Sequence, residues 1–312
     1  MKTMHRYLAC AAMLAVTTGG VATAQSAQGG PLRQMMMKRW MAKQQGGQAK
    51  APGATDIAYG NDSAQHLEFW RVTKAGAPAP LVIFVHGGGW KRGDMDNATG
   101  VAKVTHSLEH GYAFASIDYR LVPAATVEQQ AQDVADAVAK LLRDAPKLGI
   151  DPHRVVLMGH SAGAHLAALV GTDTRYLENA GLRADALRGI VLLDGAAYDV
   201  PRQIAEGGRF MHDTYLQAFG SDPARQKALS PTFQVAAPNA PSFLILHIDR
   251  ADGTAQSEAL GSALRKAGVA AEVKGFDGAG LRGHMEINRK LGDPAYPATP
   301  VVDEYLRRIF GA

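Results

Sequence analysis

Ser161 is the residue whose setting in the sequence most directly indicates chemistry. It lies in GHSAG (159–163), after a run of four apolar residues and before an alanine-rich segment with helical character. A serine hydroxyl is a weak nucleophile, so it needs a base within hydrogen-bonding reach and donors for the oxyanion that forms. Gly-x-Ser-x-Gly between a strand and a helix is typical of a strained turn that exposes such a serine. Ser161 is therefore the candidate nucleophile, and a glycine-rich turn with an idle serine is the alternative.

A second glycine-rich segment, FVHGGGWKRGD (84–94), precedes the serine in the chain. Successive glycines leave backbone N–H groups uncovered by side chains, which suits the binding of an oxyanion. Taken alone, they could also bind phosphate or form a plain loop, but no P-loop or G-x-G-x-x-G pattern supports a nucleotide site. We predict that the N–H groups of Gly88, Gly89 and Ala162 form an oxyanion hole, with Ala162 at a helix N-terminus.

These motifs carry a family resemblance. HGGGW, then SIDYRLVP (116–123), then GHSAGAH (159–165) resemble the α/β-hydrolase carboxylesterases of the hormone-sensitive-lipase and acetyl-esterase type. The chain is more similar still to the bacterial secreted group related to feruloyl esterases and kynurenine formamidases, over residues 57–311. The resemblance implies an α/β-hydrolase fold and the chain order serine, acid, histidine. One departure is Ala124 after Pro123, where the hormone-sensitive-lipase pattern usually continues YRLAPE.

The implied order places the base among the histidines after Ser161, which are His165, His212, His247 and His284. His165 lies four residues after the serine on the same helix, where packing is the better interpretation. His212 falls in a long insertion, and His247 ends an apolar run where comparable hydrolases carry a structural histidine. His284 lies in a glycine-flanked segment that we expect to be a loop near the end of the chain. The resembling family keeps its base there, so we predict that His284 is the base.

The acid is expected in a loop after the apolar run 243–246, which offers Asp249 and Asp252. In the resembling esterases the acid precedes a short turn into a helix, which favours Asp252 and leaves Asp249 as the alternative. The acid would hold the tautomer of His284 and stabilise the imidazolium. Asp194 follows another apolar run, where we expect a turn residue or a residue that lines the pocket.

The elements that must position these residues alternate along the chain. Short apolar runs predict strands, and segments with apolar residues three and four apart predict helices between them. This alternation predicts an α/β architecture with a mostly parallel central sheet and helices on both faces. The strands are expected at 66–72, 81–85, 113–117, 155–158, 190–193, 243–246 and 269–276, and the helices at 127–141, 259–267 and 301–310.

Residues 199–241 separate two predicted strands and form a candidate cap or lid. Asp118, Tyr119 and Arg120 are expected to form a structural hydrogen-bond and salt-bridge cluster under the oxyanion loop. His106 and His110 have the i, i+4 spacing of a zinc-binding helix, but the sequence suggests no third ligand, so a solvated helix face is the better interpretation. We therefore predict no metal site and no cofactor.

The N-terminus differs from the rest of the chain. Residues 1–24 combine a basic start, a short apolar run and small residues at Ala22 and Ala24, which predicts a signal peptide cleaved after Ala24. A frayed amphipathic helix is the alternative. Residues 25–55 are predicted to be a flexible leader and 56–312 a single α/β-hydrolase domain. The protein is thus expected to be secreted or periplasmic.

The charge and hydropathy of the remaining chain restrict its partners. Cleavage after Ala24 would remove two of the 33 basic residues and none of the 29 acidic ones, for a formal charge of about +2, which argues against nucleic acid. No apolar stretch reaches the roughly 18 residues of a membrane-spanning helix. We predict a serine carboxylesterase that acts on small-molecule esters. An amide or formamide hydrolase and a catalytically silent binding protein are the alternatives.

Overall fold

The computed structural model describes residues 51–73, 76–96 and 99–311. The predicted signal peptide (1–24) lies outside the described residues, as does most of the predicted leader (25–55). The last leader residues belong to the domain, because Thr55 begins the first strand and the buried Ala51 accepts a hydrogen bond from the Trp70 indole (3.2 Å). Residues 51–55, which the prediction assigned to the leader, thus pack with the domain.

One eight-stranded sheet organises the domain, in the order β1-β2-β4-β3-β5-β6-β7-β8. β1 and β2 pair antiparallel at one edge of the sheet. The other six strands, β4, β3, β5, β6, β7 and β8 in sheet order, are mutually parallel. The strands are β1 (Thr55–Ala58), β2 (His66–Trp70), β3 (Ala79–Val85), β4 (Ala113–Ile117), β5 (Ile150–His160), β6 (Gly189–Leu193), β7 (Ser242–Ile248) and β8 (Ala270–Phe276).

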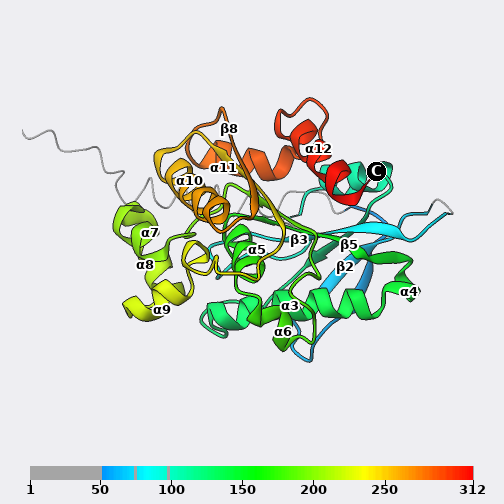
Figure 1. The fold of residues 1–312 in the computed structure, drawn as a ribbon, viewed down its shortest axis with the longest axis horizontal. Coiled ribbons are helices and arrows are strands. Elements are labelled where there is room, and N and C mark those ends of the chain that lie inside the picture. Colours follow the sequence, from blue (N-terminus) through cyan, green and yellow to red (C-terminus); the bar gives the residue numbers. More distant parts are fainter. Residues whose placement is uncertain (1–50, 74–75, 97–98, 312) are drawn as a thin grey trace, which may run out of the picture. The chain divides into compact units, whose positions relative to one another are not determined.

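Helices follow the strands and cover both faces of the sheet (Figure 1). They are α2 (Val101–Glu109), α3 (Val127–Arg143), α4 (Ala145–Leu148), α5 (Ala162–Thr172), α6 (Arg175–Asn179), α7 (Val200–Glu206), α8 (Gly208–Phe219), α9 (Pro223–Ala228), the 3₁₀ turn η1 (Pro231–Phe233), α10 (Ala251–Lys266), α11 (Gly280–Lys290) and α12 (Ala298–Phe310). None of these described helices combines the length and the apolar character that crossing a membrane requires. The predicted α/β architecture is confirmed.

The core has two layers because neighbouring side chains of each strand point to opposite faces. In β3, Leu81, Ile83 and Val85 pack with α3, α5 and α10, whereas Val82 and Phe84 pack with α2, α11 and α12. All of these strand side chains are fully buried, which explains why β3 reads as a continuous apolar run.

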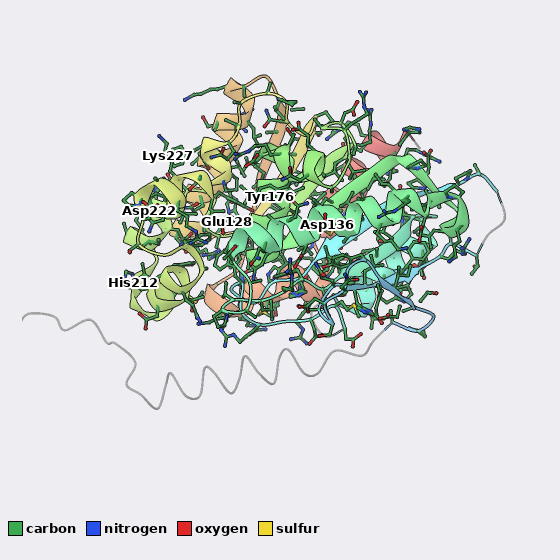
Figure 2. The ribbon with its side chains drawn as sticks, turned by 90° about the horizontal axis from the view of Figure 1, so that it is seen from below. Glu128, Asp136, Tyr176, His212, Asp222 and Lys227 are labelled. Carbon is green, nitrogen blue, oxygen red and sulfur yellow. The ribbon has the colours of Figure 1, made fainter. Side chains whose placement is uncertain are left out.

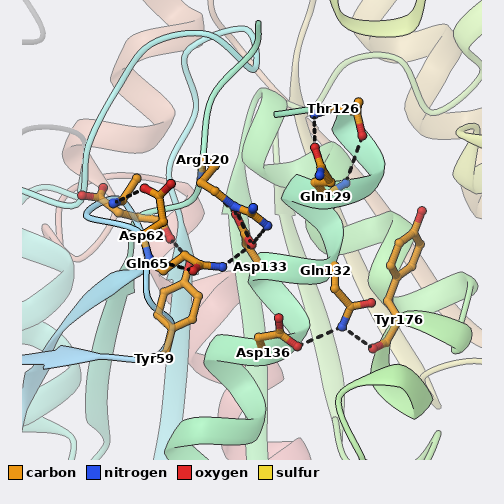
Figure 3. Close-up of polar contacts among 12 residues, drawn as sticks. Tyr59, Asp62, Gln65, Arg120, Thr126, Gln129, Gln132, Asp133, Asp136 and Tyr176 are labelled. Carbon is orange, nitrogen blue, oxygen red and sulfur yellow. Dashed lines mark hydrogen bonds and ion pairs between the residues drawn. The ribbon is translucent and has the colours of Figure 1, made fainter. Parts of the chain in front are cut away.

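The amphipathic helix α3 begins at the predicted residue. Thr126 caps it, since its side chain accepts from the Gln129 N–H while the Gln129 side chain accepts from the Thr126 N–H. On the inner face of α3 the buried Asp133 carboxylate accepts hydrogen bonds from Arg120, in the loop after β4, and from Gln65, in the loop before β2 (Figure 3). These contacts tie the antiparallel edge of the sheet to the segment that supports the glycine-rich loop.

Candidate active site

Ser161 occupies a strained turn between β5 and α5. Its backbone has φ +55° and ψ −118°, a region that side-chain-bearing residues rarely adopt. The Ser161 N–H donates to Leu193 O at the end of β6 (3.0 Å), and its hydroxyl does not cap the helix. The side chain remains partly exposed at the carboxyl edge of the sheet. The structure has the strand, sharp turn and helix that the sequence motif predicts.

The two glycines of the motif are required by close backbone packing. A Cβ atom at Gly163 would lie 2.2 Å from Val85 O and 2.4 Å from His86 O, and one at Gly159 would lie 2.2 Å from Gly163 O. Real Cβ contacts are longer than this, so any larger residue forces the backbone apart. The turn is therefore held against the end of β3, where the other glycine-rich segment begins.

That segment passes directly beside the serine. A Cβ atom at Gly87 would lie 3.0 Å from the Ser161 Cβ, so only glycine lets the chain approach this closely. Gly88 and Gly89 follow with φ values of +128° and +63°. The loop thus brings the predicted oxyanion donors to the neighbourhood of Ser161 and Ala162, and their role in binding an oxyanion stays a prediction.

Buried polar contacts fix the glycine-rich loop from below. The His86 ring stacks on Tyr119 with 4.3 Å between centroids, and the Tyr119 hydroxyl donates to His86 O (2.9 Å). Burial lowers the pKa of His86 to about 4, so the ring is neutral at neutral pH. Asp118 accepts from the Met95 N–H (2.5 Å) further along the same loop. With the Arg120 contact to Asp133, these bonds confirm the predicted structural cluster.

His284 is paired with Asp194. His284 Nδ1 lies 2.6 Å from Asp194 Oδ2, with the carboxylate fully buried and the imidazole only 17% exposed. Asp194 also accepts from the Ile248 N–H (3.2 Å) and from Arg250 Nε (3.2 Å). Asp194 follows β6 directly, with φ +42°, while His284 lies on α11. The carboxylate thus has three donors and holds the histidine from a rigid strand end.

The charge state of Asp194 follows from these partners. Burial by itself raises the pKa of Asp194, but the hydrogen bond and charge of His284, together with Arg250 and the Ile248 N–H, outweigh it and bring the pKa to about 2. The group is therefore an ionised carboxylate at neutral pH. A neighbouring carboxylate of this kind fixes the proton on His284 Nδ1 and leaves Nε2 to accept one.

The sequence prediction that Asp252 orients His284 is wrong. Asp252 lies in the first turn of α10 and contacts Arg250 Nη1 (2.6 Å). Asp249, the alternative, lies beside Gly275 on β8. The reason is that α10 begins at residue 251, directly after β7, so Asp252 is on a helix instead of in an extended loop. His284 is likewise on α11 and not in the expected loop.

His160 is a further site residue that the sequence interpretation did not identify. Its Nε2 lies 2.9 Å from the backbone O of His284, and the two rings are 4.6 Å apart. Burial and the neighbouring charge of His284 lower the pKa of His160 well below its ordinary value, so the neutral ring donates Nε2–H to that carbonyl. His160 directly precedes Ser161, so this hydrogen bond links the His284 segment to the serine turn. Its place inside the GHSAG motif was the available signal.

The chain is similar in sequence to known esterases. A family model described as BD-FAE matches residues 67–188. Esterase LipC of Mycobacterium tuberculosis is 33% identical over 210 residues, which cover 62% of this chain and 50% of that protein. Esterase LipQ of the same organism is 31% identical over 70% of this chain and 54% of its own length. The chain spans about half the length of these curated relatives.

Solved structures extend the likeness over nearly all of the chain. Esterase B from Lactobacillus rhamnosis covers 90% of this chain and 93% of its own, with a TM-score of 0.70 at 22% identity. The chain has the α/β-hydrolase fold. Propionate-bound esterase 2 from Thermogutta terrifontis covers 83% of this chain and 95% of its own, with a TM-score of 0.66 at 24% identity. The fold that the sequence motifs imply is thereby confirmed.

Within this α/β-hydrolase fold His165 and His247 are buried, and their rings make structural hydrogen bonds. His165 accepts from the Trp90 indole N–H at Nδ1 (3.3 Å) and donates from Nε2 to Leu229 O (2.8 Å). Burial lowers its pKa to about 4, so this neutral tautomer persists. His247 is buried and bonds through Nδ1 to Ile248 O (3.0 Å). His212 is exposed on α8, where Figure 2 labels it.

The insertion of the α/β-hydrolase fold, between β6 and β7, contains α7, α8, α9 and η1. Figure 1 shows α7, α8 and α9 grouped together at the left of the view. Helix α8 packs on the glycine-rich loop, since a Cβ atom at Gly89 would lie 3.1 Å from Thr214 Cγ2. Trp90 packs edge-on against Phe219 of α8 (4.7 Å between centroids) and Tyr215 (6.0 Å). The predicted cap region is therefore helical and lies against the candidate oxyanion loop.

Proposed function

We propose that the chain hydrolyses carboxylic esters of small molecules through an acyl-enzyme on Ser161. The observation that carries this proposal is the 2.6 Å contact between His284 Nδ1 and a buried, ionised Asp194. The same His284 contacts His160 through its backbone O (2.9 Å), and His160 directly precedes the serine in its strained turn. The named activities of the similar esterases support it. The acid of this triad is Asp194 in place of Asp252.

Each residue has a defined step. Ser161 Oγ attacks the ester carbonyl carbon while His284 Nε2 takes the hydroxyl proton, and Asp194 stabilises the imidazolium that results. The N–H groups of Gly88, Gly89 and Ala162 donate to the oxyanion. The bond to the alcohol oxygen then breaks, and His284 returns the proton to the leaving alcohol. Water, activated by His284, adds to the acyl carbonyl and releases the acid and free Ser161, a cycle that needs no cofactor.

The direct test is the rate of p-nitrophenyl acetate hydrolysis by wild type and by Ser161→Ala. We expect the substitution to remove enzymatic turnover while the circular dichroism spectrum and the thermal midpoint stay unchanged, because the side chain is partly exposed and does not cap α5. Labelling of wild type by a fluorophosphonate, absent in the variant, would identify the nucleophile. Turnover retained by a folded Ser161→Ala protein would refute the proposal.

The leaving group is the second variable. The same triad cleaves amides, so a comparison of kcat/KM for an aryl ester and for N-formylkynurenine decides between an esterase and a formamidase. We expect the ester to be preferred. A protein that is not labelled by a fluorophosphonate and turns over neither substrate would be a binding protein with a hydrolase fold.

We also propose that the insertion 199–241 caps the substrate site and that the chain is exported. The contact of α8 with the glycine-rich loop supports the first proposal. The basic, apolar and small-residue pattern of residues 1–24 supports the second. N-terminal sequencing of protein recovered from outside the cytoplasm should begin at Gln25, and an intact N-terminus there would contradict cleavage.

A further inference from the structure

Helix α2 presents two histidines to the C-terminal helix α12. His106 and His110 are one turn apart on α2 and its C-cap, with 4.1 Å between ring centroids. His106 Nε2 lies 2.7 Å from Asp303 Oδ1 of α12. Asp303 is therefore the third ligand-type side chain that the sequence spacing of the histidines did not reveal, because it lies almost 200 residues away in the chain.

The three side chains offer a compact set of ligand atoms. One atom from each of His106, His110 and Asp303 lies within 4.8 Å of the other two. His110 Nδ1 is engaged by the His106 backbone O (2.8 Å), so Nε2 is the ring nitrogen it can offer without breaking a bond. Zinc ligands at about 2.1 Å in a tetrahedron are about 3.4 Å apart, so the side chains must rotate to bring one atom of each to that spacing around an ion.

We propose that His106, His110 and Asp303 bind one Zn²⁺-class divalent cation. Two imidazoles and a carboxylate are a ligand set suited to borderline cations, and a water molecule would complete four-coordination. A small cavity of about 20 Å³, lined by His106 and Asp303 together with Thr299, adjoins the set and has room for one water. The cation replaces the proton that His106 Nε2 and Asp303 share.

Charges around the set are compatible with a cation. The histidines lie at the C-terminal end of α2, where the helix dipole favours positive charge. Lys103 also lines the cavity, but its ammonium is directed to Asn288 on α11, with Oδ1 at 2.9 Å, and burial lowers the pKa of Lys103 to about 7. At neutral pH a fraction of Lys103 is therefore neutral, which reduces its average repulsion of a bound cation.

The site is separate from the catalytic centre. α2 runs back across the sheet and His110 lies just before β4, at the amino edge of the parallel strands. Ser161 follows β5 at the opposite, carboxyl edge. A cation bound here cannot touch the ester. Its effect is to cross-link α2 to α12 and so to stabilise the C-terminal helix on the domain.

The test uses the untagged full chain stripped of metal. Equilibrium dialysis against Zn²⁺ should give one bound ion per chain, and added Zn²⁺ should raise the thermal midpoint. Loss of one of three ligands should weaken binding by at least about tenfold, so His110→Gln, at an exposed position, should lose most of the midpoint shift while remaining folded without metal. Esterase activity of metal-free wild type and His110→Gln should be equal.

His153→Gln is the matched control, since His153 is also exposed but lies on β5 outside the set. It should keep wild-type affinity for Zn²⁺. Asp303→Asn should weaken binding like His110→Gln, and Co²⁺ substitution should give the visible absorption of a four-coordinate site in wild type only. Absence of bound zinc in wild type, equal affinity in His110→Gln, or unaltered affinity in Asp303→Asn would each overturn the proposal.

Discussion

Replacement of Asp194 by asparagine tests the reassigned acid. Asp194 Oδ2 faces two donors, His284 Nδ1–H and Arg250 Nε–H, while Oδ1 accepts from the Ile248 N–H. An asparagine has one oxygen and one NH₂ group, so an oxygen kept for Ile248 places the NH₂ group against His284 Nδ1. That nitrogen must then become the acceptor, which moves the imidazole proton to Nε2, the atom that has to receive the serine proton.

The expected loss is large because no water can replace the carboxylate, whose side chain is fully buried. The wrong tautomer costs a serine hydrolase about 10³- to 10⁴-fold in kcat. This corresponds to about 4 to 5 kcal/mol in the activation barrier. KM for p-nitrophenyl acetate should change much less, since Asp194 is behind the histidine and does not contact the ester.

Asp252→Asn is the matched comparison, because it removes the same charge from a neighbour of the same arginine. The Asp252 side chain is 35% exposed and contacts Arg250. We expect kcat to fall by less than about tenfold, since the Asp252 carboxylate contacts Arg250 and not His284. Steady-state kinetics of both variants with p-nitrophenyl acetate decide the matter. A collapse of kcat in Asp252→Asn with near-normal turnover in Asp194→Asn would refute the assignment drawn from the structure.

Three further results are expected. Folding lowers the pKa of Asp194 from 3.8 to about 2, so its ionised form stabilises the native state above about pH 4 and this contribution disappears as the pH falls toward 2. The difference in the free energy of unfolding between wild type and Asp194→Asn, measured in urea, should therefore narrow over that range. A constant difference would contradict this expectation. Gly163→Ala should fold poorly or lose activity, because its Cβ meets backbone oxygen at 2.2 Å; an active, equally stable variant in a thermal melt would show that the turn relaxes. His165→Ala should lower the free energy of unfolding by about 2 to 4 kcal/mol by leaving a cavity and an unpaired Leu229 carbonyl, and a loss below about 0.5 kcal/mol in urea would argue against this bridge.

Local patterns were enough to predict most strands. The run 113–117 coincides with β4, and the expected strands at 81–85, 190–193 and 243–246 all lie inside observed strands. β5 is longer than expected because Asp151, His153 and Arg154 interrupt the apolar pattern at its amino end, where side chains are exposed. β1 was missed because its residues are mostly exposed and form no apolar run.

The sequence placed the serine turn and singled out His284, whereas it did not identify the carboxylate that contacts this histidine. Ser161 is specified by its immediate neighbours, and His284 by its position late in the chain. Asp194, Asp249 and Asp252 all follow parallel strands whose carboxyl ends meet at one edge of the sheet. Which of them meets the histidine depends on where α10 begins and how α11 approaches the sheet, and no short pattern encodes that.

The bridge through His165 bears on how this protein could be redesigned. Trp90 of the glycine-rich loop, His165 of α5 and the Leu229 carbonyl of the insertion form one chain of hydrogen bonds. The insertion is consequently not an interchangeable part. Replacing 199–241 by a foreign segment, in order to accept another substrate, would also remove the carbonyl that fixes the His165 tautomer. Because His165 in turn accepts from Trp90, the replacement would disturb the position of the glycine-rich loop as well. A graft that keeps Leu229 and its backbone carbonyl in place should therefore be the more successful design.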